Sequence, residues 1–348
     1  MMSKLFSNFK IKDMDLKNRI VMAPMCMDSC NDEDGLANNW HLIHYSTRSI
    51  GGVGLIIIES TGIQPGGRIT DNDLGIWSDN HIENLSKIVD ECHKYGSKIG
   101  IQINHAGRKS ETLSYPIIAP SPIAFNDDYR LPNEMTKEDI TTTIDLFKDA
   151  AKRALTAGFD LLELHGAHGY LIDEFLSPLT NKRKDEYGGT KENRVRFLKE
   201  IIQAVKTVWP ETKPLQLRVS AVDYEKGGNN AKETSSLINL VKDMGIDIIN
   251  VSSGGTVPAK IFTYPGYQIR YSETIRKQCN IPTIAGGLIT SPLMAEEILN
   301  NKRSDLVYLG RELLRNPYWA FAAANQLGDN IKWPIQYERS NKVNKNGF

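Results

Sequence analysis

Apolar and polar positions along the chain follow two regular patterns that alternate. Short, almost continuously apolar runs are typical of parallel strands that are buried on both faces. Between them lie longer segments in which apolar residues recur every three or four positions, as on one face of an α-helix. The pattern predicts strands at 19–25, 53–60, 98–104, 160–165, 215–220, 246–252, 283–286 and 305–310. It predicts helices at 40–50, 79–95, 136–157, 191–208, 231–244, 272–278 and 291–300.

The order of these elements indicates the fold class. A helix between successive strands makes the strands parallel, and eight such units are the number in a (β/α)8 barrel. Doubly wound sheets usually have fewer strands, about five or six. We therefore predict an α/β fold, a (β/α)8 TIM barrel that forms a single domain over 1–340, with a disordered tail at 341–348. A hairpin at 6–16 is expected to close the barrel bottom, and the long, proline-containing segment 110–135 is expected to act as a lid.

Composition excludes several classes of partner. The 348 residues carry a formal net charge of zero, so no overall field favours nucleic acid or an anionic membrane. An apolar run long enough to span a membrane is missing from the sequence, and the first residues are too polar for a signal peptide. We expect a soluble, cytoplasmic protein that acts on a small molecule. Cys26, Cys30, Cys92 and Cys279 form no CxxC pair, which argues against a disulfide or a cysteine metal site.

The strand predicted at 160–165 ends in the most informative motif, His165-Gly-Ala-His168-Gly-Tyr170. Barrels of this kind keep their chemistry at the carboxyl ends of the strands. Two imidazoles there can hold an oxygen by hydrogen bonds, and a neighbouring phenol can supply a proton. A simpler interpretation is a turn whose histidines only satisfy backbone groups. The intervening glycines favour a site, because they let a ligand approach the backbone closely.

Other predicted strand ends carry groups suited to an anionic, planar, amide-rich ligand. Gln102 offers both a donor and an acceptor, and Arg218 can stabilise negative charge, although it could equally form an ion pair with a neighbouring carboxylate. The last two strand ends supply glycine-rich turns and Arg311, where barrels commonly bind phosphate. No GxGxxG follows a strand and opens a helix, so a Rossmann nicotinamide site is not supported.

Besides a site that holds a substrate oxygen and donates a proton, two other functions fit the barrel on these residues alone. One is a metal-dependent hydrolase or lyase with His105, His165 and His168 as ligands, although Asp28 and Asp223 are the only carboxylates near the strand ends. The other is a catalytically idle barrel that binds FMN or a protein partner.

Four motifs resemble the Old Yellow Enzyme family of FMN-dependent ene-reductases. They lie at 18–26, 100–109, 185–194 and 305–319, and with the His165 motif they span nearly the whole chain in the family's order. Cys26 and the His-x-x-His spacing are similar to the thermophilic-like bacterial branch. This branch usually has a tyrosine at the position of Asp28, where a carboxylate would oppose negative charge on a substrate oxygen.

The resemblance implies a ping-pong reaction in which NADPH or NADH reduces FMN and leaves before the substrate binds. The substrate is an α,β-unsaturated carbonyl or nitro compound. His165 and His168 would hold its oxygen, Tyr170 would donate a proton, and Asp28 would lie near the oxygen. Arg339 would reach the site of a neighbouring subunit in a homodimer or homotetramer. Residues implied to contact the cofactor are Ala23, Pro24, Met25, Cys26, Ser60, Gln102, Arg218, Gly287, Gly310 and Arg311, with Cys26 tuning the flavin potential. No metal ion is implied.

Overall fold

A parallel β-barrel forms the centre of the computed structural model, which describes residues 2–341. Its strands follow one another around the barrel in chain order, and the last pairs with the first. This closure confirms the predicted (β/α)8 barrel. The strands are β3 (Ile20–Met22), β4 (Leu55–Gly62), β6 (Lys98–Asn104), β9 (Leu161–Gly166), β10 (Leu215–Ser220), β11 (Ile248–Ser252), β12 (Thr283–Ala285) and β13 (Leu306–Leu309), and the short β5 (Leu74–Gly75) extends β4.

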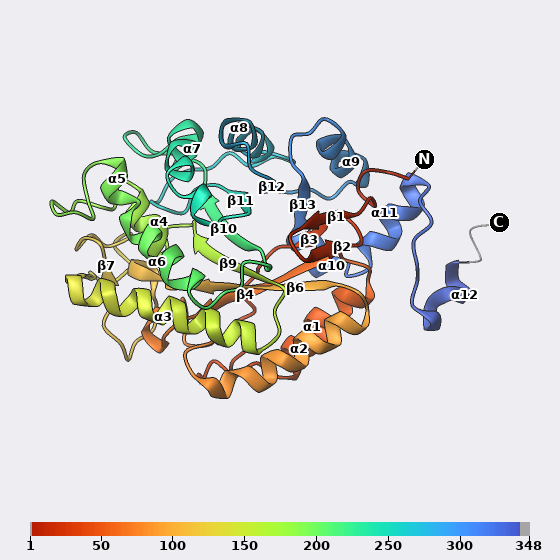
Figure 1. Ribbon diagram of the computed structural model, residues 1–348, viewed down its shortest axis with the longest axis horizontal. Helices are drawn as coiled ribbons and strands as arrows, with labels where there is room; N and C mark the ends of the chain where they lie inside the picture. Colours follow the sequence, from red (N-terminus) through yellow and green to blue (C-terminus); the bar gives the residue numbers. More distant parts are fainter. Residues whose placement is uncertain (1, 342–348) are drawn as a thin grey trace.

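Helices surround the barrel, with α1 to α3 on one side and α7 to α9 on the opposite side in Figure 1. Capping residues set the helix ends: Thr136 and Asp139 form a reciprocal capping box at the start of α3. The helices are α1 (Asn39–Ile50), α2 (Ile82–Lys94), α3 (Lys137–Thr156), α4 (Leu171–Leu176), α5 (Lys191–Arg194), α6 (Arg196–Lys206), α7 (Ala231–Asn239), α8 (Ile269–Cys279), α9 (Pro292–Asn300), α10 (Arg311–Arg315), α11 (Trp319–Leu327) and α12 (Glu338–Asn341).

Three helix predictions need correction. The predicted helix 191–208 divides at Val195 into α5 and α6, where Arg194 donates hydrogen bonds to the carbonyls of Leu176 and Gly189. The predicted helix 231–244 ends as α7 at Asn239, and its last turn is the 3₁₀ helix η4 (Lys242–Met244). The helix predicted at 272–278 begins earlier, at Ile269, because this buried residue extends the apolar face.

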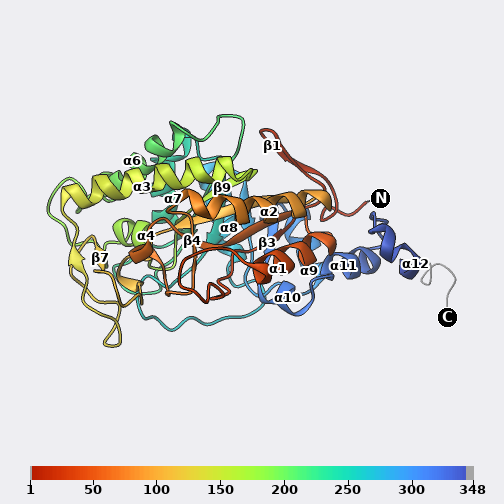
Figure 2. The same ribbon diagram turned by 90° about the horizontal axis from the view of Figure 1, so that it is seen from below.

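The lower part of the barrel is filled by apolar side chains and closed by the N-terminal hairpin. Strands β1 (Phe9–Ile11) and β2 (Met14–Leu16) pair antiparallel, as the sequence predicted. Met14 and Leu16 are buried in the same apolar cluster as Leu55, Leu161 and other inward-facing strand residues. Figure 2 shows this hairpin and strand β7, described next, toward opposite ends of the molecule. Ligands therefore reach the barrel interior from the end opposite the hairpin, where the strands finish.

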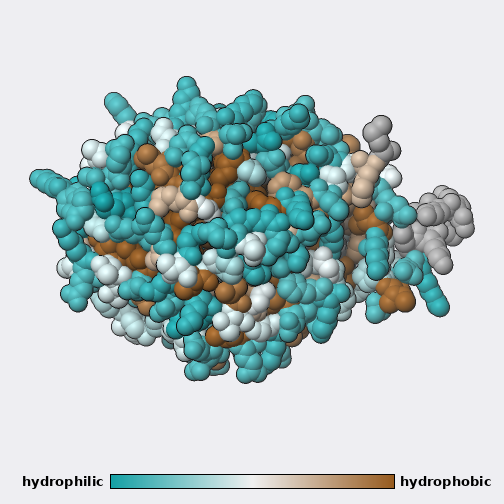
Figure 3. Space-filling model, viewed as in Figure 1, coloured by the Kyte–Doolittle hydropathy of each residue, from teal (hydrophilic) through white to brown (hydrophobic). Residues whose placement is uncertain are grey.

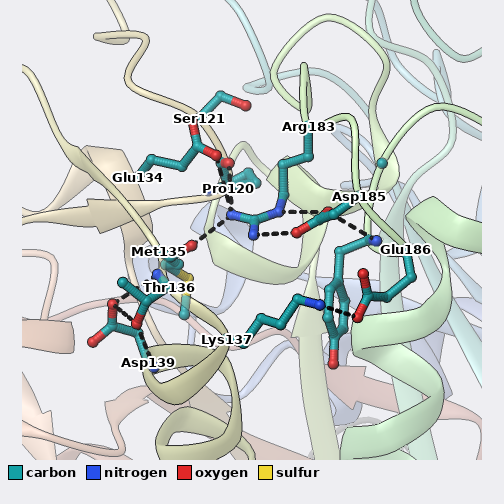
Figure 4. Close-up of polar contacts among 12 residues, drawn as sticks. Pro120, Ser121, Glu134, Met135, Thr136, Lys137, Asp139, Arg183, Asp185 and Glu186 are labelled. Atoms are coloured by element: carbon teal, nitrogen blue, oxygen red, sulfur yellow. Dashed lines mark hydrogen bonds and ion pairs between the residues drawn. The ribbon is translucent and has the colours of Figure 1, made fainter.

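The long segment 110–135 is anchored to the barrel at both of its ends. It contains strands β7 (Ile118–Ala119) and β8 (Asn133–Glu134), which pair parallel and were not predicted. Arg183 donates hydrogen bonds to the carbonyls of Pro120 (3.3 Å) and Met135 (2.6 Å), while Asp185 binds its other side (Figure 4). Arg108 donates to the carbonyl of Ile123 (3.1 Å). These contacts fix the segment over the carboxyl ends of the strands.

Hydrophilic side chains cover most of the face in Figure 3. Within the described residues, helices long and apolar enough to cross a lipid bilayer are absent. Helix α12 ends at residue 341, so the predicted tail is helical at its first residue, and its remainder, 342–348, lies outside the described residues.

Candidate active site

A cavity of about 300 Å³ opens at the carboxyl ends of β3, β10, β11 and β13. Its position agrees with the rule that barrel sites lie at this end. Seven of the predicted cofactor residues line it, namely Ala23, Pro24, Met25, Arg218, Gly287, Gly310 and Arg311. The sequence reasoning missed several other lining residues. Tyr267, Gln268 and Arg315 are among these, and they lie in or beside loops where no strand pattern marks them.

One end of this cavity suits an anionic group. Gly287 has φ +101°, a conformation that favours glycine, and a Cβ there would lie 3.0 Å from the Tyr267 ring. Gly310 precedes α10, and Arg311 supplies positive charge, whereas Arg315 is paired with Glu312 (2.6 Å). A guanidinium group beside open backbone can bind a phosphate group. This end therefore fits the phosphate of FMN.

The other end of the cavity offers groups for a planar ring. Arg218 is buried, and its Nε has no hydrogen-bond partner within the protein. The nearby carboxylate of Glu163 is instead held by the side-chain amides of Gln102, Gln216 and Asn250. A buried donor without a partner is costly, so the guanidinium is suited to a bound ligand rather than to the ion pair.

Gln102 and Ser60 do not line the cavity but lie side by side at the ends of β6 and β4. The register between these strands shifts between Ile58 and Ser60, and this bulge pairs Ser60 with Gln102. One amide hydrogen of Gln102 goes to Glu163 (2.7 Å), which leaves its oxygen and second hydrogen for a ligand edge. These free groups match the amide edge of a flavin pyrimidine, so the residues present fit FMN.

Cys26 follows the lining residue Met25 and is partly exposed. Burial raises the pKa of its thiol well above the usual value, and the carboxylates of Asp73 and Glu59 act in the same direction. The thiol is therefore protonated at neutral pH, a state that does not favour a nucleophile. All four cysteines are free.

The structure brings His165, His168 and Tyr170 together next to the cavity. The His165 ring centroid lies 5.1 Å from that of His168 and 4.9 Å from that of Tyr170. His165 pairs with Arg218 across β9 and β10, and His168 Nε2 lies 2.7 Å from Oγ of the lining residue Ser252. Two imidazoles and a phenol thus border the same space as the cofactor residues.

Burial sets the protonation of these three groups. It lowers the pKa of His165 and of His168 well below their usual range, with nearby positive charges adding to the effect. Burial also raises the pKa of Tyr170 well above its usual value. At neutral pH both imidazoles are uncharged, and the phenol keeps its proton.

The alternative metal site is not formed. His105 Nδ1 accepts the N–H of Gly107 (3.0 Å), and its Nε2 lies 2.7 Å from the Gln64 amide nitrogen. Burial lowers the pKa of His105 to about 4. Across residues 2–341, no three His, Cys, Asp or Glu side chains are grouped as ligands of one ion.

The remaining predicted substrate residues are not among those that line the cavity. Asp28 is exposed with φ +48°, and its carboxylate accepts a hydrogen bond from Thr70 Oγ1 (3.0 Å). Arg339 is exposed on α12, which Figure 1 shows at the far end of the molecule from β7. Its contact with a neighbouring subunit stays a prediction.

Known proteins resemble this chain over most of its length. The model of the NADH:flavin oxidoreductase / NADH oxidase family matches residues 4–330. An NADPH dehydrogenase of Clostridium acetobutylicum is 58% identical over 97% of this chain and 99% of its own. Morphinone reductase is similar in structure, with a TM-score of 0.81 and 26% identity over 96% of this chain and 92% of its own.

A solved complex of 2-naphthoyl-CoA reductase superposes with a TM-score of 0.88 and 25% identity over 94% of this chain. The match covers 52% of that enzyme, so the chain spans about half of its length. The chain belongs to the NADH:flavin oxidoreductase / NADH oxidase family, the Old Yellow Enzyme family that its motifs resemble, and is an NAD(P)H-dependent FMN oxidoreductase.

Proposed function

We propose that the protein is an ene-reductase, which reduces the C=C bond of α,β-unsaturated carbonyl or nitro compounds. The observation that carries the proposal is the cluster of His165, His168 and Tyr170 beside the cavity. It combines two neutral hydrogen-bond donors for an oxygen with one protonated acid for a carbon. Enone reduction uses both the donors and the acid, because negative charge builds on the substrate oxygen and the α-carbon takes up a proton.

The cofactor and the chain have separate tasks. When bound, FMN would supply the redox chemistry, which is hydride transfer from the reduced nicotinamide to the substrate β-carbon. Arg218 and Gln102 would hold its ring, while Gly287, Gly310 and Arg311 would hold its phosphate. Because Arg218 is a fixed positive charge, it would also favour the reduced, negatively charged ring.

His165 is set up to donate a hydrogen bond to the substrate oxygen. Its Nδ1 accepts the N–H of Ala167 (3.3 Å), so the neutral ring carries its proton on Nε2. Ser252 Oγ accepts an amide hydrogen of Gln268 (3.2 Å), so its own hydrogen can go to His168 Nε2 (2.7 Å). His168 then carries its proton on Nδ1 and is the second donor. Both donors remain in place as negative charge builds on the oxygen.

Tyr170 would give its Oη proton to the α-carbon. Its raised pKa keeps this proton on the phenol until a strongly basic carbon forms. Loss of the proton would leave a buried phenolate near Arg218, which is the nearby group that lowers its pKa.

Rapid mixing of Tyr170→Phe tests the proposal. We expect oxidation of reduced enzyme by 2-cyclohexenone to slow about 100-fold or more, whereas reduction by NADPH stays within about twofold. Tyr187→Phe is the matched control, since its hydroxyl binds Glu200 (2.9 Å) outside the site. An equal loss in both half-reactions would mean that Tyr170 is structural. No reduction of any enone or nitroalkene by the parent enzyme would overturn the proposed function.

A further inference from the structure

Two turns in left-handed conformation meet behind the proposed oxygen-binding site. His168 and Gly169 have φ +62° and +74°, and Gly254 and Gly255 have φ +74° and +88°. Their backbones are in direct contact, because a Cβ on Gly169 would lie 2.2 Å from the Gly255 carbonyl oxygen. A non-glycine residue in this conformation, such as His168, is held against its own preference by its surroundings.

Two buried side chains bridge these turns. Ser220 Oγ accepts the backbone N–H of His168 (2.9 Å) and donates to the carbonyl of Gly254 (2.7 Å). Asp173 Oδ2 accepts the backbone N–H of Gly169 (2.8 Å) and the hydroxyl of Thr256 (2.7 Å). The amide side of the His168 turn is therefore satisfied by neutral and acidic acceptors.

Lys109 makes the third bridge, and it binds the carbonyl of His168 itself. Its Nζ donates to the carbonyl of His168 (3.0 Å) and lies 3.4 Å from that of Gly255. The ammonium lies 5.2 Å from the Tyr170 ring centroid and 4.5 Å from that of Phe125. A compact ammonium with three donors suits two converging carbonyls and two ring faces better than a planar guanidinium.

We propose that Lys109 is a positioning residue whose ammonium fixes the His168 turn and thereby the separation of the imidazole and phenol groups. The roles of His168 and Tyr170 in this statement rest on the proposed function. Lys109 itself donates to main-chain carbonyls and leaves the substrate oxygen to the two histidines. It also joins the anchored segment 110–135, through Phe125, to the reacting groups.

Three variants of the FMN-loaded protein test this role. Lys109→Met removes the ammonium and retains an apolar stem, and Lys109→Arg restores a cation. Lys242→Met is the control, because Lys242 Nζ also binds a main-chain carbonyl, that of Cys279 (2.7 Å), away from the site. Hydrogen exchange of the His168 and Gly169 amides is followed by NMR without ligand, and 4-chlorophenol is then titrated to measure binding.

In Lys109→Met we expect faster exchange of both amides and a dissociation constant for 4-chlorophenol raised about tenfold or more. FMN content should stay within about twofold, since the residues assigned to the cofactor lie outside the His168 turn. Lys109→Arg should recover part of the affinity, and Lys242→Met should match the parent.

Unchanged exchange at His168 and Gly169 in Lys109→Met overturns the proposal, even if ligand affinity falls, because Lys109 would then contact the ligand directly. Faster exchange with unchanged affinity also overturns it, because the turn would not position the binding groups. If His165→Ala and His168→Ala bind 4-chlorophenol as the parent does, the proposed function fails instead, and the exchange result still reports on Lys109 separately.

Discussion

Truncation of either histidine should weaken the binding of a phenolate above the oxidised cofactor. A phenolate oxygen is a stable substitute for the negatively charged oxygen that forms during enone reduction. In the structure each imidazole has one nitrogen occupied, by Ala167 N–H in His165 and by Ser252 in His168, which leaves one donor per ring. A hydrogen bond to a charged group contributes about 1.5–3 kcal/mol. His165→Ala and His168→Ala should therefore each raise the dissociation constant of 4-chlorophenol about 10- to 150-fold.

The assay is a titration followed by the long-wavelength charge-transfer band between phenolate and flavin. The double variant should lose less than the sum of the two single losses, because the rings are in contact and share one oxygen. His93→Ala is the control, since His93 is exposed and pairs with Asp160 (2.7 Å), which is not a residue of the site. Affinities of both single variants within twofold of the parent would refute the idea that this pair holds the oxygen.

Three further outcomes are expected. Heat denaturation should release one FMN per chain, and release of FAD would contradict the fit of the cavity. Asp28→Tyr should tighten 4-chlorophenol binding and accelerate reduction of 2-cyclohexenone, because a hydroxyl replaces an exposed carboxylate; a variant with full FMN content that is no faster contradicts this. Burial raises the pKa of Glu174 to about 8, above its value in the unfolded chain, so its stabilising contribution is present at low pH and is lost as pH rises toward 8. In urea unfolding, the stability of Glu174→Gln relative to the parent should therefore increase between pH 5 and pH 8. A difference in the free energy of unfolding that stays constant over this range would contradict the raised pKa of Glu174.

The sequence was sufficient to predict the barrel, because each buried parallel strand leaves an apolar run that is visible without tertiary information. The active-site motif was equally visible, since His165, His168 and Tyr170 are within six positions of one another. The break at Val195 could not be predicted, because neither glycine nor proline marks it in the sequence.

Other parts of the site depend on contacts between distant segments. Gln268 reaches Ser252 and Ser253 from a loop without a regular pattern, and nothing local marks it. The bulge in β4 decides that Ser60 stands beside Gln102, although alternation along the strand does not predict an extra residue. Lys109 belongs to the motif at 100–109, but its contacts with the carbonyls of His168 and Gly255 could not be predicted without the fold.

The two anchors of segment 110–135 have a consequence for how the substrate range of the enzyme can change. Arg183 ties Pro120 to Met135, so the ends of the intervening chain are held close together whatever its middle contains. For a loop with fixed ends, doubling the length costs only about 0.6 kcal/mol of closure entropy. Insertions or exchanges at 126–131 should thus be tolerated without disturbing the barrel. Residues 126–131 are therefore a place where evolution or protein engineering can change the chain while the active-site residues keep their positions.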